Sequence, residues 1–190
     1  RGAMCQGRDG RLYWAVAHAT PVEGISGISL MISADGGSTW AYSCPIAVDQ
    51  KIGFNETSLH ETAHGHLVAF VRTEKYDDQT VIARSTDKGK SFRWEGAGFQ
   101  GHPHHAVRLP DGRVWLVYGY RHKPYGIRAR ILDPDCTQAD KSPEIVLRDD
   151  GGSSDLGYPW AVVLPGGQVL TVYYFNQENG TREIAGTVCG

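Results

Sequence analysis

Short runs of apolar, β-branched and aromatic residues recur at four places along the chain, each directly after a polar turn that contains glycine. The runs cover residues 12–16, 67–71, 114–118 and 169–173. Such a composition favours strands over helices. No long stretch combines a 3.6-residue apolar period with capping residues, so helices are not expected. The pattern predicts an all-β chain.

Further strands are expected around these runs. One follows each run, at 27–33, 80–85, 126–132 and 182–188, and one precedes three of them, at 57–60, 105–109 and 159–164. The repeating unit is therefore a blade of about four antiparallel strands, the arrangement that β-propellers repeat around an axis. Four blades are predicted, at roughly 1–48, 49–98, 99–150 and 151–190.

Two of the predicted hairpins share the pattern S-x-D-x-G-x-[ST]-aromatic, at 33–40 and 85–92. The aspartate can accept bonds from backbone N–H groups, and glycine can adopt a left-handed conformation. These segments resemble the Asp-boxes of the sialidase-like (neuraminidase, BNR-repeat) β-propeller superfamily. In that family the boxes are structural, so Asp35 and Asp87 are not expected in catalysis. A third blade has the sequence 133–136, Asp-Pro-Asp-Cys, where a box should be, and we expect that copy to have decayed.

The resemblance implies a sialidase-like β-propeller whose rings have six blades, of which about four are present here. An open arc of blades would expose two sheet edges, and proteins generally cover such edges. The chain is therefore expected to be a fragment, with the missing blades of the parent propeller as its partners.

Composition and charge exclude several other classes of partner. The formal net charge is −2 and no basic run occurs, which gives no reason to expect nucleic acid or an anionic membrane. The apolar runs are too short to span a bilayer. The four cysteines form no CxxC pair, which argues against a zinc knuckle or a dithiol redox motif, and a disulfide between blades is the minor alternative. No metal site and no cofactor are expected. Localisation is left open, with a secreted or periplasmic protein slightly favoured.

Strand reversal sorts the chemistry onto one face of the blades. The Asp-box turns lie at one end, whereas the starts of first strands and the ends of second strands lie at the other. Acidic, basic and aromatic residues gather at this second end: His18, Asn55, Glu56, Arg72, His102, His104, His105, Tyr120, Arg121, Tyr125, Arg128, Tyr158, Tyr174 and Asn176. A functional site is expected there.

The segment 55–59, followed by Arg72, resembles the catalytic glutamate and second arginine of exo-sialidases. Those enzymes use a tyrosine nucleophile deprotonated by a glutamate, and arginines hold the substrate carboxylate. The resemblance implies that Glu56 is the base, Tyr158 the nucleophile, and Arg72 and Arg128 carboxylate ligands. The family's first arginine and acid/base aspartate have no counterpart that can be placed in this chain. The predicted activity is hydrolysis of a terminal, carboxylate-bearing sugar from a glycan.

Two alternatives stay open. The cluster of His102, His104 and His105, together with Arg121 and Tyr125, has no counterpart in the sialidase mechanism. Such residues suit a uronate polysaccharide lyase, in which arginine or histidine neutralises a carboxylate while histidine or tyrosine moves protons. We therefore also consider Arg121, His102, His104 and Tyr125 as substrate-binding residues. The other alternative is a non-catalytic propeller that binds glycan or protein.

Overall fold

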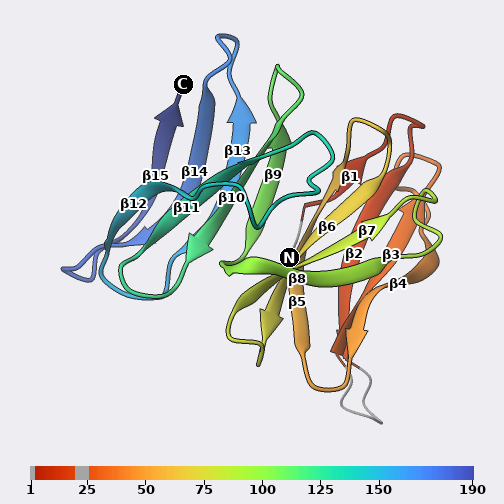
Figure 1. Ribbon diagram of the computed structural model, residues 1–190, viewed down its shortest axis with the longest axis horizontal. Helices are drawn as coiled ribbons and strands as arrows, with labels where there is room; N and C mark the ends of the chain where they lie inside the picture. Colours follow the sequence, from red (N-terminus) through yellow and green to blue (C-terminus); the bar gives the residue numbers. More distant parts are fainter. Residues whose placement is uncertain (1–2, 20–25) are drawn as a thin grey trace. The chain divides into compact units, whose positions relative to one another are not determined.

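A computed structural model describes residues 3–19 and 26–190, and within them every regular element is a β-strand (Figure 1). Antiparallel neighbours that follow one another in sequence make up four separate sheets. The all-β expectation is thereby confirmed. None of the described residues belongs to a helix long and apolar enough to cross a membrane.

Each sheet is one blade, and its strands are arranged in chain order. The first blade contains β1 (Cys5–Gln6), β2 (Leu12–Ala19), β3 (Ser26–Ser33) and β4 (Ala41–Asp49). The second contains β5 (Gly53–Glu61), β6 (Leu67–Glu74), β7 (Gln79–Ser85) and β8 (Arg93–Gln100). The third contains β9 (His104–Arg108), β10 (Val114–Tyr120), β11 (Tyr125–Leu132) and β12 (Ile145–Gly151). The fourth contains β13 (Gly157–Val163), β14 (Val169–Asn176) and β15 (Arg182–Cys189).

The four apolar runs form β2, β6, β10 and β14, the second strand of each blade. These strands extend two or three residues beyond the predicted runs, because each continues its ladder toward the polar end of the blade. The first blade also has a short first strand, β1, where Cys5 pairs with Tyr13. Sequence reasoning had placed the start of this blade almost directly at its second strand, because two residues leave no periodic signal.

The chain divides into two compact units, Arg1–Phe99 and Gln100–Gly190. In the first unit, Ile28 and Leu30 of β3 are fully buried against residues of the second blade such as Leu59 and Ala69. In the second unit, apolar residues of β10, β11, β13 and β14 form an equivalent core. Apolar side chains between successive blades therefore hold each unit together.

The hairpins of Asp35 and Asp87 have the same hydrogen-bond pattern. In the first, the Asp35 carboxylate accepts bonds from the Ser33 hydroxyl at 2.7 Å and from the Thr39 hydroxyl at 2.6 Å. In the second, Asp87 accepts from the hydroxyls of Ser85 at 2.7 Å and Ser91 at 2.6 Å. Each carboxylate also accepts a backbone N–H bond. Side-chain bonds of this kind close the turn between the third and fourth strands.

The third blade retains part of this turn in altered form. Asp133 accepts backbone N–H bonds from Asp135 at 3.0 Å, Thr137 at 2.8 Å and Gln138 at 3.0 Å. Cys136 adopts a left-handed conformation, with φ of 57°, in place of a glycine. The aspartate's clamping role has therefore moved to the residue directly after the strand, although the serine and the glycine of the pattern are gone.

None of the four cysteines forms a disulfide. Cys44 and Cys136 are buried, whereas Cys5 and Cys189 are half-buried. Burial raises the pKa of the Cys44 and Cys189 thiols, which keeps both in the protonated, less reactive form. The minor alternative of a disulfide is therefore not found.

The Asp35 hairpin should make stability depend on acid pH. Bonds from Thr39 and Ser33 lower the pKa of Asp35 to about 2, below the value of roughly 4 for an unfolded aspartate. Its contribution is therefore complete above about pH 5 and is lost as the pH falls toward 2. We expect Asp35→Asn to lower the urea-unfolding midpoint near neutral pH, with a difference from wild type that vanishes near pH 2.

Asp149→Asn is the matched control, because the Asp149 carboxylate lies exposed and accepts no side-chain bond among the described residues. A difference for Asp35→Asn that persists unchanged at about pH 2 would contradict the assigned role of the charge.

Candidate functional site

A β-bulge brings Glu56 and Arg72 together in the first unit. The pairing of β5 with β6 shifts between Phe54 and Thr57, so that Asn55 and Glu56 lie opposite the single residue Arg72. Bulges of this kind redirect side chains beside functional sites. Arg72 Nη1 donates to Glu56 Oε2 at 2.7 Å, and their side chains are 18% and 11% exposed. The pair is therefore largely removed from water.

A second carboxylate lies beside this pair. Glu74 Oε1 accepts a hydrogen bond from Asn55 Nδ2 at 3.0 Å and lies 3.9 Å from Arg72 Nη2. Sequence reasoning missed Glu74, although a signal was present: residues 72 and 74 are two positions apart on one strand and so point to the same face. The guanidinium of Arg72 thus has a carboxylate on either side.

In the second unit, Tyr158 lies at the start of β13 in an uncommon backbone conformation. Its φ is 50°, in the left-handed region, and the preceding Gly157 has φ of 118°. The pairing of β13 with β14 is interrupted over this stretch, between Gly157 and Trp160. Bulky residues rarely adopt this conformation, and where they do the strain tends to accompany a functional site.

Arg121 lies over the Tyr158 ring, with its guanidinium carbon 5.6 Å from the ring centroid. Its Nε donates to the Leu156 carbonyl at 3.1 Å, which fixes the side chain. Among residues 3–19 and 26–190, no carboxylate pairs with Arg121. A half-buried guanidinium held by its Nε presents its two terminal nitrogens for another acceptor.

Glycine at position 119 allows three segments to approach one another at this place. A Cβ on Gly119 would lie 2.8 Å from the His102 carbonyl oxygen and 3.0 Å from Gly157 Cα. His102 N–H also donates to the Gly119 carbonyl at 2.9 Å. The third and fourth blades therefore bring His102, Arg121 and Tyr158 into one neighbourhood.

Arg128 occupies a different environment from the one expected of a substrate ligand. Its side chain is 4% exposed, and its Nε lies 3.5 Å from Glu144. Its terminal nitrogens donate to the carbonyls of Pro124, at 3.0 Å, and Arg148. The guanidinium also lies 4.9 Å from the centroid of the Tyr120 ring. These contacts inside the blade favour a structural role for Arg128.

Glu144, whose side chain is 33% exposed, connects the buried Arg128 and Tyr118 and was not found by sequence reasoning. It accepts a hydrogen bond from the Tyr118 hydroxyl at 2.8 Å, and that hydroxyl accepts one from Arg130 Nε at 3.0 Å. Burial raises the pKa of Tyr118, which keeps the phenol protonated. No sequence signal marks Glu144, because it follows a long loop after β11 and lies just outside β12.

The histidines of the third blade are mostly buried. His102 and His104 are 4% and 7% exposed. Burial, and then the neighbouring His102, lower the pKa of His104 to about 3. His105 has a pKa lowered to about 4 by burial, and its Nδ1 accepts a bond from Ala161 N–H at 3.1 Å. Both His104 and His105 are therefore neutral at physiological pH.

Tyr125 and Tyr174 make contacts within the second unit. Tyr125 is half-buried and packs against the apolar core of the second unit. Tyr174 donates to Asp155 at 3.0 Å and accepts from Arg182 at 2.9 Å. In residues 3–19 and 26–190, no cluster of three His, Cys, Asp or Glu residues could hold a metal ion.

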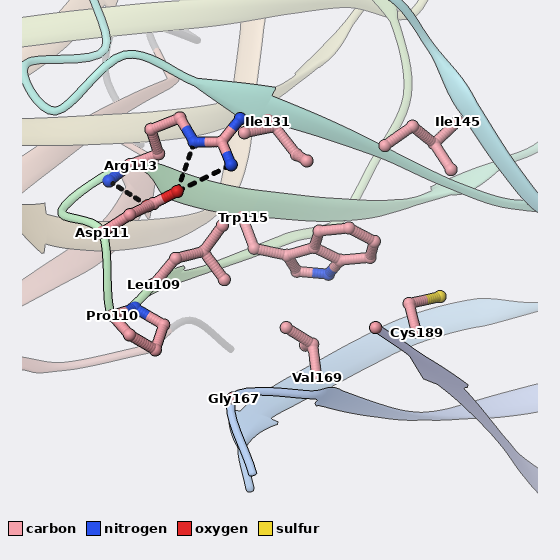
Figure 2. A pocket seen from close by; sticks show the side chains of 11 residues that line it. Leu109, Pro110, Asp111, Arg113, Trp115, Ile131, Ile145, Gly167, Val169 and Cys189 are labelled. Atoms are coloured by element: carbon pink, nitrogen blue, oxygen red, sulfur yellow. Dashed lines mark hydrogen bonds and ion pairs between the residues drawn. The ribbon is translucent and has the colours of Figure 1, made fainter.

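An apolar cavity of about 420 Å³ lies at the opposite end of the second unit's blades (Figure 2). It is lined by Trp115, whose indole points into it, and by residues of the 109–113 turn and the end of β15. An ion pair between Asp111 and Arg113, at 2.6 Å, lies at its side. The cavity is thus separate from Arg121 and Tyr158, which are at the other ends of their strands.

The four sheets each consist of successive antiparallel strands, and aspartate side chains close hairpins within them. The acidic, basic and aromatic candidate residues lie at the opposite strand ends. These features define a sialidase-like β-propeller. The family model described as "BNR repeat-like domain" matches residues 1–172. The chain therefore belongs to the BNR repeat-like family. A comparison with curated proteins gave no match.

Solved structures support the same fold. A protein of unknown function from Dyadobacter fermentans is 56% identical, with a TM-score of 0.96 over 99% of this chain and 52% of that one. The chain thus spans about half the length of that protein. An α-L-arabinanase from Penicillium chrysogenum, complexed with arabinobiose, is 16% identical, with a TM-score of 0.72 over 96% of this chain and 63% of that one. A Hadza microbial sialidase is 16% identical, with a TM-score of 0.68 over 97% and 36%.

The buried environment of Arg128 leads to a stability prediction. Arg128→Met removes the cation beside Glu144 and leaves two backbone carbonyls without their donor, so unfolding free energy should fall by about 3 kcal/mol or more. Urea unfolding followed by tryptophan fluorescence measures the loss. Arg113→Met, which removes an exposed pair, is the control and should cost no more than about 1 kcal/mol. Equal, small losses for the two variants would contradict the structural role of Arg128.

Proposed function

We propose that this chain forms part of a glycoside hydrolase that releases a terminal, carboxylate-bearing sugar from a glycan. The observation that carries the proposal is the pairing of Tyr158 with Arg121: a strained tyrosine lies under a guanidinium that no carboxylate among the described residues neutralises. The propeller relatives named as an arabinanase and a sialidase support glycoside hydrolysis as the reaction class. Because these two are 16% identical to the chain, they support its fold and leave its substrate to experiment.

Tyr158 is assigned the role of nucleophile. Its phenolic oxygen would bond to the anomeric carbon while the glycosidic C–O bond breaks and the leaving oxygen takes a proton. Water would then attack the same carbon, release the sugar and restore the phenol. A tyrosine needs a proton acceptor for this step at neutral pH, because a free phenol has a pKa of about 10.

Proton transfer is assigned to Glu56 on the basis of the sequence resemblance and of its surroundings within the first unit. It is a carboxylate with a largely buried side chain and a cation at 2.7 Å, and a bulge directs it away from the regular ladder. These features are typical of an acid or base that takes part in chemistry. Arg72, which lies between Glu56 and Glu74, then orients Glu56, and substrate binding is a smaller part of its role.

Arg121 is assigned the carboxylate of the sugar. A guanidinium fork matches a carboxylate with two parallel hydrogen bonds, and Arg121 presents its terminal nitrogens for this purpose. Arg128 was the other candidate, but its donors already serve carbonyls and Glu144. Carboxylate recognition in this chain is therefore proposed to rest on Arg121, with His102 nearby.

No observation in the histidine cluster specifically favours the lyase. The burial of His104, and the backbone bond that His105 accepts, suit packing better than proton transfer to a polysaccharide. Uronate cleavage and binding without catalysis remain outcomes of the experiment below.

The proposal is tested in the full-length protein with fluorogenic sialosides, glucuronides and α-L-arabinosides, alongside absorbance of unsaturated uronate products. Glu56→Gln should lower kcat by about 100-fold or more, because the amide cannot transfer the proton. Tyr158→Phe should lower it by about 1000-fold or more, because the attacking oxygen is gone.

Glu61→Gln is the matched control: Glu61 lies on the same strand as Glu56 but at its other end, where it pairs with Arg8 at 3.8 Å. It should leave kcat within about twofold of wild type. Rising absorbance on a uronate polymer, with no glycoside cleaved, would replace hydrolysis with the lyase reaction. Inactivity in all of these assays would contradict the proposed hydrolase.

Arg121 should determine preference for charge. Arg121→Met removes the proposed carboxylate ligand, so KM for a carboxylate-bearing substrate should rise by about tenfold or more while KM for a neutral glycoside stays the same. Steady-state kinetics on matched acidic and neutral glycosides measures this ratio. An equal change in both KM values would show that Arg121 does not recognise the carboxylate.

A further inference from the structure

The position of Glu56 depends on the bulge that carries it. In a regular ladder, neighbouring residues of a strand alternate between its two faces, and each has one partner. At Asn55 and Glu56 two residues face one, so the backbone here is not fixed by ladder hydrogen bonds alone. Some other contact must hold this stretch if Glu56 is to stay 2.7 Å from Arg72.

Glu74 supplies such a contact through a single oxygen. Its Oε1 accepts the hydrogen bond from Asn55 Nδ2 at 3.0 Å and lies 3.9 Å from Arg72 Nη2. Asn55 is one of the two bulge residues, and Arg72 is the residue that the bulge opposes. Glu74 therefore contacts both sides of the irregularity at once.

The backbone holds Glu74 in place although its side chain is 51% exposed. Its cross-strand partner is Gly53, where a Cβ would lie 3.1 Å from the Cβ of Glu74. Glycine at position 53 thus leaves room for the Glu74 side chain beside the strand. Larger residues there would push it away from Asn55.

The loop after Glu74 is closely constrained as well. Lys75, Asp77 and Asp78 have φ of 63°, 51° and 51°, so three of the four residues that follow are left-handed. The Thr73 hydroxyl donates to the Gln79 carbonyl at 2.6 Å and closes the loop at its base. Glu74 therefore stands at the last position of β6 before a tightly defined turn.

We propose that Glu74 is a positioning residue that pins the Asn55–Glu56 bulge and so aims Glu56. Its effect on catalysis rests on the proposed function, because it acts through Glu56; its effect on the bulge does not. An exposed ion pair contributes little to stability, so the 3.9 Å approach to Arg72 is the weaker contact and the bond from Asn55 is the one that matters. Displacing a catalytic group by about 1 Å can cost about 100-fold in rate even where stability hardly changes.

The experiment compares Glu74→Ala, Glu74→Gln, Asn55→Ala and the double variant Asn55→Ala/Glu74→Ala in the full-length protein. Glu74→Ala should lower kcat about tenfold, with KM within about twofold. Glu74→Gln should recover most of the activity, because its amide oxygen still accepts from Asn55. The kcat of the double variant should be no lower than that of the slower single variant, because both substitutions remove the same Asn55–Glu74 contact.

Glu61→Ala is the matched control, since Glu61 also contacts an arginine, Arg8, but lies at the end of β5 far from the bulge. Wild-type kcat in Glu74→Ala, or losses that multiply in the double variant, would overturn the proposal.

Hydrogen–deuterium exchange separates this proposal from the proposed function. Amides of residues 53–57 should exchange several-fold faster in Glu74→Ala than in wild type or Glu61→Ala, whether or not a glycoside is cleaved. Faster exchange in a protein that hydrolyses no glycoside would support the role of Glu74 in holding the bulge and refute only the proposed hydrolase activity. Unchanged exchange would refute the pin, whatever the activity.

Discussion

Antiparallel pairing on both sides of the second strand is the constraint on which each blade depends. β6 is bonded to both β5 and β7, and β10 to both β9 and β11. Because direction reverses at each step, the end of the second strand lies beside the start of the first and the start of the third. This is how Arg72 comes to face Glu56. Shifting the register by one residue would turn every such side chain to the opposite face, so the site is as firmly fixed as the ladder.

The sequence was sufficient to predict the strands and hairpins of the blades, because these depend on patterns of neighbouring residues. Contiguous apolar runs mark the second strands, and in β6 and β10 residues on both faces of the run are buried. The Asp35 and Asp87 hairpins depend on residues within seven positions of one another. Within each unit, strand reversal also indicated which strand ends carry candidate residues: Glu56 and Arg72 in the first unit, and Arg121 and Tyr158 in the second. Their roles stay predictions. Each of these inferences needs only the order of residues along one or two neighbouring strands.

What could not be predicted depends on contacts between distant segments or on departures from regular geometry. Glu144 reaches Tyr118 across 26 positions, and nothing in its neighbourhood indicates that it would anchor Arg128. The sequence also gives no signal for the left-handed conformation of Tyr158 or for the bulge at Asn55, because tyrosine and asparagine adopt regular strand geometry elsewhere. The altered turn at Asp133 belongs here too: its carboxylate still closes the turn although the recognisable pattern is lost.

The arginines illustrate why residue type alone does not assign a role. A guanidinium has five N–H donors, and inside a blade backbone carbonyls can accept from them where the chain turns back beside the arginine. Arg128 donates to the carbonyls of Pro124 and Arg148 and lies beside Glu144, so its donors are occupied by contacts within the fold. Arg72 meets two carboxylates and keeps part of its surface toward solvent.

Arg121 meets one carbonyl and an aromatic ring, and neither of these neutralises its charge. Burying a cation without an acid is costly unless something else compensates it, so a half-buried Arg121 beside a strained tyrosine is difficult to explain by stability alone. A folded domain that tolerates both costs at one place gains something there other than stability. An anionic ligand at Arg121 would compensate the charge, and this is the physical reason to look for the substrate's carboxylate at this arginine before any other.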